Sequence, residues 1–358
     1  MAKRVTIAEI AAECQLAVSS VSMILNHKNI KRFHPETVEL VFNTAHRLGY
    51  KKKGKEINLS RTTSSIIVVV CPSLTNPFYT TLIQGIEMVA RASGFTTSVR
   101  TTYWDTKTEK LIIQEAEQTH VAGVIFAMIP QQPELTYELT KTIPVVAIGD
   151  RRNDLELATV DMNNYIAGQL LGQHLLDLGH RKIAYLSTTL NEHHTSRLRR
   201  LEGLRDVISR TPGARLSVLS HDIEPAFELS HLDVEYSTGY QLAERCLKEA
   251  PETTALVMVN DMNAYGAYDA LAAMGRKIPQ DISLAGFDNI FPSRLSSLSL
   301  TTVDNSLIEC GKSAFQLLQQ EMELFQSPSK YQSIMHVEYK CQLKIRNTTG
   351  PVKEKEND

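Results

Sequence analysis

The side chains that could carry chemistry are spread along the chain and form no known catalytic pattern. The sequence contains no G-x-G-x-x-G after its first predicted strand, no G-x-x-x-x-G-K-[ST], no G-x-S-x-G and no H-E-x-x-H. His174, His180 and the pair His193-His194 are expected at helix ends or in loops rather than around a metal ion. The sequence therefore predicts a binding protein, not an enzyme, with no catalytic residue, no cofactor and no metal site.

The cysteines do not change this prediction. They lie far apart in a long chain without a C-x-x-C pair, so we expect reduced, half-buried small apolar residues rather than disulfides or metal ligands. They are Cys14, Cys71, Cys246, Cys310 and Cys341.

Composition narrows the class of protein further. The 358 residues are 42% apolar and 22% charged, which suffices for large cores and excludes a disordered or fibrous chain. No window approaches the ~18 uninterrupted apolar residues of a membrane span, and the N-terminal MAKRVTIAEI has no apolar secretory core. We therefore expect a cytoplasmic protein with no membrane partner.

Charge is divided unevenly along the chain. Residues 1–55 hold ten Lys and Arg against four Asp and Glu, a balance of +6, and the whole chain has a net charge of −2, so the rest carries −2 − 6 = −8. A small basic head on an acidic body predicts a polyanionic partner for the head alone.

The basic head is predicted to form three short helices. Thr6-Ile7-Ala8-Glu9 has the form of a capping box, which predicts a helix that begins at Ile7. Apolar residues then recur at helical spacing over 7–14 and 18–25, and a third stretch runs from His34-Pro35-Glu36 to Gly49. This layout is typical of a helix-turn-helix, whose second helix can enter a major groove.

The exposed face of the second helix limits how it could read bases. Small hydroxyls and apolar tips can contact phosphates or thymine methyl groups, but they cannot make the bidentate contact of Arg with guanine. These positions are Val18, Ser19, Ser20, Ser22 and Met23. An ordinary three-helix module with a solvated polar face remains the alternative.

From residue 66 onward, short apolar segments alternate with amphipathic ones. Such alternation predicts parallel sheets in two doubly wound lobes, with ligands beyond the carboxyl ends of the strands. The predicted strands are 66–71, 97–101, 123–127, 145–148, 182–186, 255–259 and 282–287. The predicted helices are 78–92, 108–118, 166–178, 199–208, 240–248 and 263–273.

Residues 6–26 resemble the DNA-binding headpiece of the LacI/GalR family of bacterial transcription regulators in spacing and apolar positions. They depart from the family pattern at Gln15, Ala17 and Met23, which leaves the fold intact and the operator sequence open. The body is similar to the same family's periplasmic-binding-protein-like core. The matching runs are NPFY at 76–79, LGHRKIA at 178–184, RLEG at 200–203, NDMNAYG at 260–266, GFDN at 286–289 and LTTV at 300–303.

The resemblance implies a division of labour along the chain. It gives a headpiece over 1–50, a hinge over 51–65, a core over 66–346 with lobes at about 66–162 plus 291–325 and 163–290 plus 326–346, and a charged tail over 347–358. In the hinge, Leu59 stands at the position of a Leu that wedges into the minor groove. The alternative is a lone apolar residue in a flexible tether.

The resemblance also implies the residues of both sites. Candidate DNA contacts are Thr6, Val18, Ser19, Ser20, Ser22, Met23, Asn26 and Leu59. The candidate effector cleft holds Phe78, Tyr79, Asp150, Asn163, Arg200, Asn260 and Asp288.

We therefore expect a homodimeric transcription regulator, a repressor, that binds a near-palindromic operator in double-stranded DNA. A small-molecule effector, a sugar or sugar derivative, would control it as inducer or co-repressor. The rival interpretation is a cytosolic carbohydrate-binding or sugar-modifying α/β protein whose basic head docks onto another protein.

Overall fold

In a computed structural model the chain divides into two compact units, Met1–Thr62 and Thr63–Asp358. The structure describes residues 6–25, 33–34, 37–38, 40–41, 44–45, 65–119, 121–150, 155–326 and 333–353. Of the predicted DNA contacts, Asn26 and Leu59 lie outside these residues, as does much of the predicted third helix and the predicted hinge before residue 65.

The first unit contains the two predicted N-terminal helices. Helix α1 spans Ile7–Glu13 and helix α2 spans Val18–Leu25, and the described residues between 37 and 45 are also helical. Their inward faces form one small core. The core residues are Ile10, Ala11, Cys14, Val21, Ile24, Val41 and Ala45.

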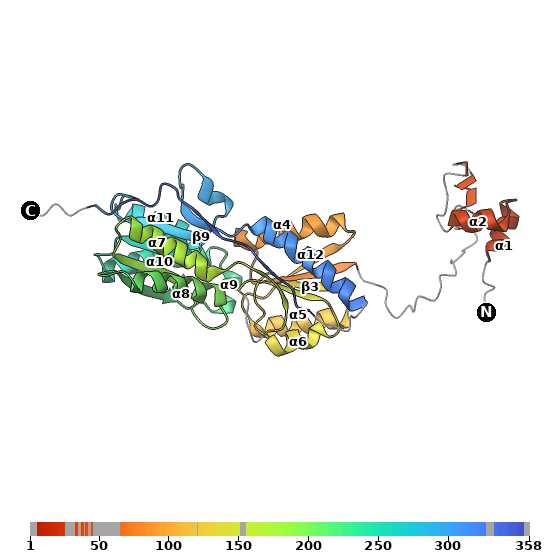
Figure 1. Cartoon of the computed structure of the whole chain (residues 1–358), viewed down its shortest axis with the longest axis horizontal. Coiled ribbons are helices and arrows are strands. Elements are labelled where there is room, and N and C mark those ends of the chain that lie inside the picture. Colours follow the sequence, from red (N-terminus) through yellow and green to blue (C-terminus); the bar gives the residue numbers. More distant parts are fainter. Residues whose placement is uncertain are drawn as a thin grey trace, which may run out of the picture. The chain divides into compact units, whose positions relative to one another are not determined.

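The second unit contains two six-stranded sheets, each the centre of one lobe (Figure 1). The first sheet has the order β11-β5-β4-β3-β1-β2 and its strand pairs are parallel. Its strands are β1 (Ile66–Cys71), β2 (Thr96–Thr101), β3 (Gly123–Phe126), β4 (Val145–Ile148), β5 (Ala158–Asp161) and β11 (His336–Glu338).

Helices cover both faces of the first sheet, with α4 and α12 on one side and α5 and α6 on the other (Figure 1). They are α4 (Pro77–Ala92), α5 (Thr106–Gln118), α6 (Pro133–Thr140) and α12 (Leu307–Gln326). Helices α4 and α12 approach so closely that a Cβ added at Gly311 would lie 2.2 Å from the carbonyl oxygen of Leu82.

The second sheet has the order β12-β10-β9-β8-β6-β7 and is parallel except for β12. Its strands are β6 (Lys182–Thr188), β7 (Arg215–His221), β8 (Ala255–Met258), β9 (Ser283–Asp288), β10 (Thr301–Asp304) and β12 (Gln342–Lys344). Its helices are α7 (Asn164–Asp177), α8 (Thr195–Ser209), α9 (Pro225–Ser230), α10 (Val234–Glu249) and α11 (Asp261–Ala273), with a 3-10 turn, η2, at Phe291–Arg294.

Two predicted lobe boundaries are wrong. Strand β10 was expected in the first lobe but pairs with β9 in the second, and β11 was expected in the second lobe but pairs with β5 in the first. The lobes are therefore 65–161 plus 307–338 and 164–304 plus 342–353, and the described chain crosses between them after β5, β10 and β11. The position of a strand of three or four residues in a sheet depends on the strands with which it pairs. These partners are distant in the sequence, so local patterns do not indicate them.

Candidate functional site

The start of α1 is closed by the predicted capping box. The backbone N–H of Thr6 donates to Glu9 Oε2 at 2.7 Å, and the backbone N–H of Glu9 donates to Thr6 Oγ1 at 3.3 Å. Two backbone donors that a helix start leaves without intrahelical partners are thereby satisfied. Thr6 is exposed beside this start and its hydroxyl is already engaged with Glu9.

Helix α2 carries five of the predicted DNA contacts, which differ in how far their side chains are exposed. Val18 and Ser19 are exposed, and the side chain of Val18 is 52% exposed. The other three candidates on this helix, Ser20, Ser22 and Met23, are half-buried rather than fully exposed. Because Val21 and Ile24 point into the headpiece core, the opposite face of α2 stays available to a partner.

A cleft lies between the two lobes, beyond the carboxyl ends of their strands. Its walls carry side chains from the first lobe, including Phe78, Tyr79 and Trp104, and from the second lobe, including Asn164 and Arg200. Its free volume is about 40 Å³, which is room for about three water molecules.

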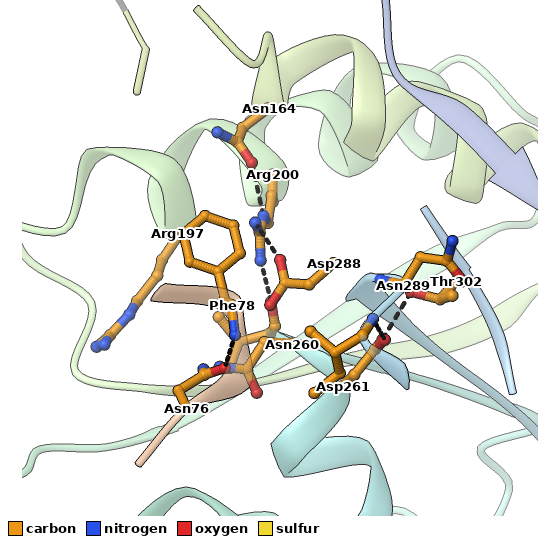
Figure 2. A network of polar contacts seen from close by, with 12 residues as sticks. Asn76, Phe78, Asn164, Arg197, Arg200, Asn260, Asp261, Asp288, Asn289 and Thr302 are labelled. Carbon is orange, nitrogen blue, oxygen red and sulfur yellow. Dashed lines mark hydrogen bonds and ion pairs between the residues drawn. The ribbon is translucent and has the colours of Figure 1, made fainter. Parts of the chain in front are cut away.

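The guanidinium of Arg200, which comes from helix α8, is a buried polar group in the cleft. Its Nη2 lies 2.9 Å from Asp288 Oδ1, its Nε donates to Asn164 Oδ1 at 2.7 Å, and its Nη1 donates to the carbonyl oxygen of Val259 at 2.5 Å (Figure 2). Arg200 and Asp288 are both buried. The structure thus brings two predicted effector residues into direct contact.

Asp288 stands beside a second buried carboxylate. Burial raises the pKa of Asp288 and Arg200 opposes that rise, while burial and the charge of Asp288 raise the pKa of Asp261. Asp261 accepts hydrogen bonds from Ser293 and Thr302 at 2.6 Å each and from the backbone N–H of Ile290 at 3.2 Å. The hydrogen bonds of Asp261 thus stabilise the loop after β9, whereas Asp288 contacts Arg200.

Two residues predicted to contact the effector, Asp150 and Asn163, have hydrogen-bond partners that we did not expect. Asp150 accepts from the backbone N–H of Asn164 at 2.9 Å and from its Nδ2 at 2.7 Å, so its hydrogen bonds go to Asn164, and it acts on Arg200 through charge alone. Asn163 has a left-handed backbone (φ 44°), caps α7 by accepting from the N–H of Ile166, and donates to Glu338 at 2.6 Å. Its neighbour Asn164, which sequence reasoning missed, is the residue that contacts Arg200.

A second missed residue, Glu235 at the start of α10, joins the lobes. Glu235 Oε2 accepts from Asn76 Nδ2 at 2.7 Å, and Oε1 accepts from Asn260 Nδ2 at 2.8 Å. Asn76 belongs to the first lobe and Asn260 to the second. The predicted residue Asn260 therefore lies in the cleft network as a partner of Glu235, and nothing in the local sequence indicates that Glu235 meets Asn76.

Further charges gather beside this bridge. Burial and the charge of Glu235 raise the pKa of Glu228 to about 7, while the charge of Arg197 lowers it. Burial also raises the pKa of Glu235, with Arg197 as the main opposing charge. Arg197 itself is directed away from Arg200 (Figure 2), so the two guanidinium groups serve different parts of the cleft.

The predicted aromatic wall is present at the start of α4. The rings of Phe78 and Tyr79 meet edge to face, with centroids 5.0 Å apart and an interplanar angle of 84°. Burial raises the pKa of the Tyr79 hydroxyl well above its usual range, so this group stays a neutral hydrogen-bonding group. The wall offers apolar ring surface to a ligand.

Two other kinds of site are not found in the part of the chain that the structure describes. No group of three or more His, Cys, Asp or Glu side chains there could hold a metal ion. No single described helix is long and apolar enough to cross a membrane. Helices α1 and α2 pass that test only jointly, as a pair bent by 106°.

Comparison with known proteins decides the family. Residues 64–346 match the model of the periplasmic binding proteins and sugar-binding domain of the LacI family. This chain belongs to the LacI family. It is 28% identical over 352 residues to the ribose operon repressor of Halalkalibacterium halodurans, covering 98% of this chain and 99% of that protein. The resemblance to the LacI/GalR regulators is thereby confirmed.

Solved structures agree on the fold of the core. A LacI family regulator from Enterococcus faecium with bound ribose has a TM-score of 0.68 and 26% identity, covering 80% of this chain and 100% of that one. A LacI-type regulator from Alkaliphilus metalliredigens, complexed with D-xylulofuranose, has a TM-score of 0.67 and 25% identity, covering 80% and 99%. The predicted two-lobed α/β architecture is confirmed, and so is the prediction of a transcription regulator rather than an enzyme.

Proposed function

We propose that this LacI-family regulator is a cytoplasmic repressor that binds a near-palindromic DNA operator as a homodimer and responds to a sugar or sugar derivative bound between its lobes. The observation that carries the effector assignment is the buried contact of Arg200 with Asp288 and Asn164 at the strand ends of the second lobe. In doubly wound folds this edge is where ligands bind.

The chemistry of the cleft suits a ring that carries neighbouring hydroxyl groups. Arg200 uses one N–H each on Asn164, Val259 and Asp288, so two of its five donors remain for a ligand. A guanidinium donates to hydroxyl oxygens, the carboxylate of Asp288 accepts from hydroxyl groups, and the rings of Phe78 and Tyr79 cover an apolar ring face. Two similar regulators were solved with bound ribose and with D-xylulofuranose, so D-ribose and D-xylulose are the first effectors to test.

The DNA-binding assignment rests on the headpiece. The exposed face of α2 with Val18 and Ser19 would enter the major groove, together with Ser20, Ser22, Met23 and Asn26, while Thr6 would approach the backbone. Leu59 of the proposed hinge over 51–65 would wedge into the minor groove. The excess of six positive charges over residues 1–55 favours contact with phosphates.

Effector and DNA binding are coupled through the arrangement of the lobes. An effector changes DNA affinity only as far as it prefers one lobe arrangement over another, typically by ~1–3 kcal/mol. The cleft is lined by residues of both lobes, so a ligand bound there would contact both and could favour one arrangement of the lobes over another.

The test is selection of the purified protein on a pool of random DNA duplexes near physiological salt, with and without D-ribose or D-xylulose. We expect an enriched near-palindrome whose recovery changes with the sugar, and binding that weakens steeply as salt rises. The absence of enrichment under every condition would contradict DNA reading and favour a carbohydrate-binding protein with a docking head.

A further inference from the structure

The two sides of the cleft between the lobes differ in chemistry. On the second-lobe side the lining is polar and includes Asn164, Ser196 and Arg200. On the first-lobe side the described lining residues carry no charge, and their only polar side-chain groups are the hydroxyl of Tyr79 and the indole N–H of Trp104. The rest of that side is an apolar wall, made by Phe78, Ala127, Met128, Ile129 and Ile148.

The apolar wall follows from two buried strands of the first sheet. Residues 127–129 come directly after β3, Ile148 ends β4, and these two strands pair in parallel. Because their carboxyl ends meet at the same edge of the sheet, the apolar side chains of both strand ends gather there. The four residues are at most 6% exposed. A Cβ added at Gly149 would lie 3.0 Å from Ile129 Cγ1, so Ile129 packs against the backbone after β4.

The polar side chains that flank the apolar wall already have partners within the protein. Asp150, two residues past β4, accepts from the backbone N–H and from Nδ2 of Asn164. Asn76, which precedes α4, donates to Glu235 and accepts from the backbone N–H of Phe78. The described part of this side therefore offers a ligand mainly apolar surface.

The opposite side keeps hydrogen-bonding groups free. Arg200 has two N–H donors beyond the three that it uses within the protein. Thr195 and Ser196 line the cleft from the first turn of α8, and their hydroxyl groups form no hydrogen bond with another residue in the described part of the chain. Hydroxyl groups of a ligand would find their partners on this side.

A ligand that touches both sides is therefore recognised differently at its two ends. A hydroxyl group placed against Met128 or Ile148 would lose its hydrogen bonds with water and gain none, which lowers affinity. An apolar group in the same place would be removed from water, which raises affinity. The apolar wall thus selects against a hydroxyl group and for an apolar substituent.

We propose that the effector is amphipathic: a glycoside whose sugar hydroxyl groups contact Arg200 and Asp288, and whose aromatic or aliphatic aglycone packs on the apolar wall. The inference rests on the proposed sugar effector of this cleft. A free sugar would use only the polar side of the site, so a glycoside with an apolar aglycone would bind more tightly.

The test compares the methyl and phenyl β-glycosides of D-ribofuranose and of D-glucopyranose by isothermal titration calorimetry of the full-length protein. For a sugar that binds, we expect the phenyl glycoside to bind at least about tenfold more tightly than the methyl glycoside, since one methylene group in an apolar pocket can already change affinity ~10-fold. The heat-capacity change should also be more negative for the phenyl glycoside, because more apolar surface is buried. Phenyl glycosides that bind no more tightly than the methyl glycosides would overturn the proposal.

Three variants locate the effect on the apolar wall. Met128→Gln places an amide there at similar size and should lower the ratio of phenyl to methyl affinity at least about threefold, whereas Met128→Leu should keep the ratio. Met88→Gln changes a methionine of α4 that is 50% exposed and should also keep it. Equal ratios in the wild type and a folded Met128→Gln would overturn packing of the aglycone on this wall; if that variant does not fold, the wild-type comparison decides.

A probe without a sugar separates the failure of this inference from the failure of the proposed function. Trp104 is the only tryptophan in the sequence and lines the same cleft, so its fluorescence reports on ligands there. If no glycoside binds, that counts against the proposed sugar effector, and benzyl alcohol then tests the apolar wall alone. A saturable change in Trp104 fluorescence that Met128→Gln weakens would support the apolar subsite, and the absence of such a change would overturn it.

Discussion

Replacing Glu235 by Gln tests the bridge between the lobes with almost no change of shape. Glu235 accepts from both Asn76 and Asn260, and neither amide can turn its oxygen toward the new side chain without loss. Asn76 Oδ1 already accepts from the backbone N–H of Phe78 at 2.9 Å, and Asn260 Oδ1 from that of Asn263 at 2.9 Å. The amide nitrogen introduced by Glu235→Gln would therefore face a second N–H donor.

The expected cost follows from these contacts. One of two hydrogen bonds to a charged group is lost, a loss of ~1.5–3 kcal/mol, and Arg197 loses an opposing charge. For a core of this size such a loss lowers the melting temperature by ~3–5 °C, since a given free energy moves a large domain by few degrees.

The assay is thermal unfolding of the full-length protein at pH 7, with Glu138→Gln as the matched control. Glu138 pairs with Lys141 at the surface, where its side chain is 65% exposed, and such pairs contribute little. We expect a shift within ~1 °C for the control. A Glu235→Gln melting temperature indistinguishable from that of Glu138→Gln would refute the bridge.

Three further outcomes are expected. Burial raises the pKa of Glu109 from 4.5 to about 7, so the free energy of unfolding falls as pH rises from 4.5 to 7 and the buried carboxyl loses its proton. The melting temperature of Glu109→Gln should therefore depend less on pH between pH 4.5 and 7 and should exceed that of the wild type at pH 8. Melting temperatures of the variant and the wild type that change in parallel with pH would contradict this. Gly311→Ala places a Cβ 2.2 Å from the Leu82 carbonyl oxygen and should destabilise by ~1–3 kcal/mol in denaturant titrations, whereas an unchanged midpoint would mean that the helices yield freely. Leu59→Ala should weaken operator binding and bending in gel-shift assays and leave effector affinity unchanged; equal operator affinity would argue against a wedge.

Short sequence patterns correctly predicted the helix starts and strands that depend on neighbouring residues alone. The capping box at Thr6 and Glu9 is present as expected, and strands such as β1 and β4 follow from short buried apolar runs. Strands β5 and β11 have only four and three residues, and they pair with each other although they lie far apart in the sequence. No local pattern could indicate that pairing.

In the cleft, too, contacts between residues that are distant in the sequence could not be predicted from local patterns. Arg200 and Asp288 were predicted and lie in contact, but the residue that accepts a hydrogen bond from Arg200 beside them is Asn164 rather than Asn163. That choice depends on the left-handed backbone at Asn163, which turns its side chain toward Ile166 and Glu338. Glu235 was missed because its partner Asn76 belongs to the opposite lobe and its partner Asn260 precedes a distant helix.

The central claim is that one cleft controls DNA binding through Arg200 and Asp288, and one titration tests it directly. The affinity of the selected operator duplex is measured for wild type, Arg200→Lys and Asp288→Asn, each with and without the sugar that changes recovery in the selection. We predict that both variants keep the wild-type affinity of the sugar-free protein for the operator within about threefold, under ~1 kcal/mol, and lose the response to the sugar. Variants that fold normally yet lose operator binding without sugar, or that respond to sugar as the wild type does, would contradict the account.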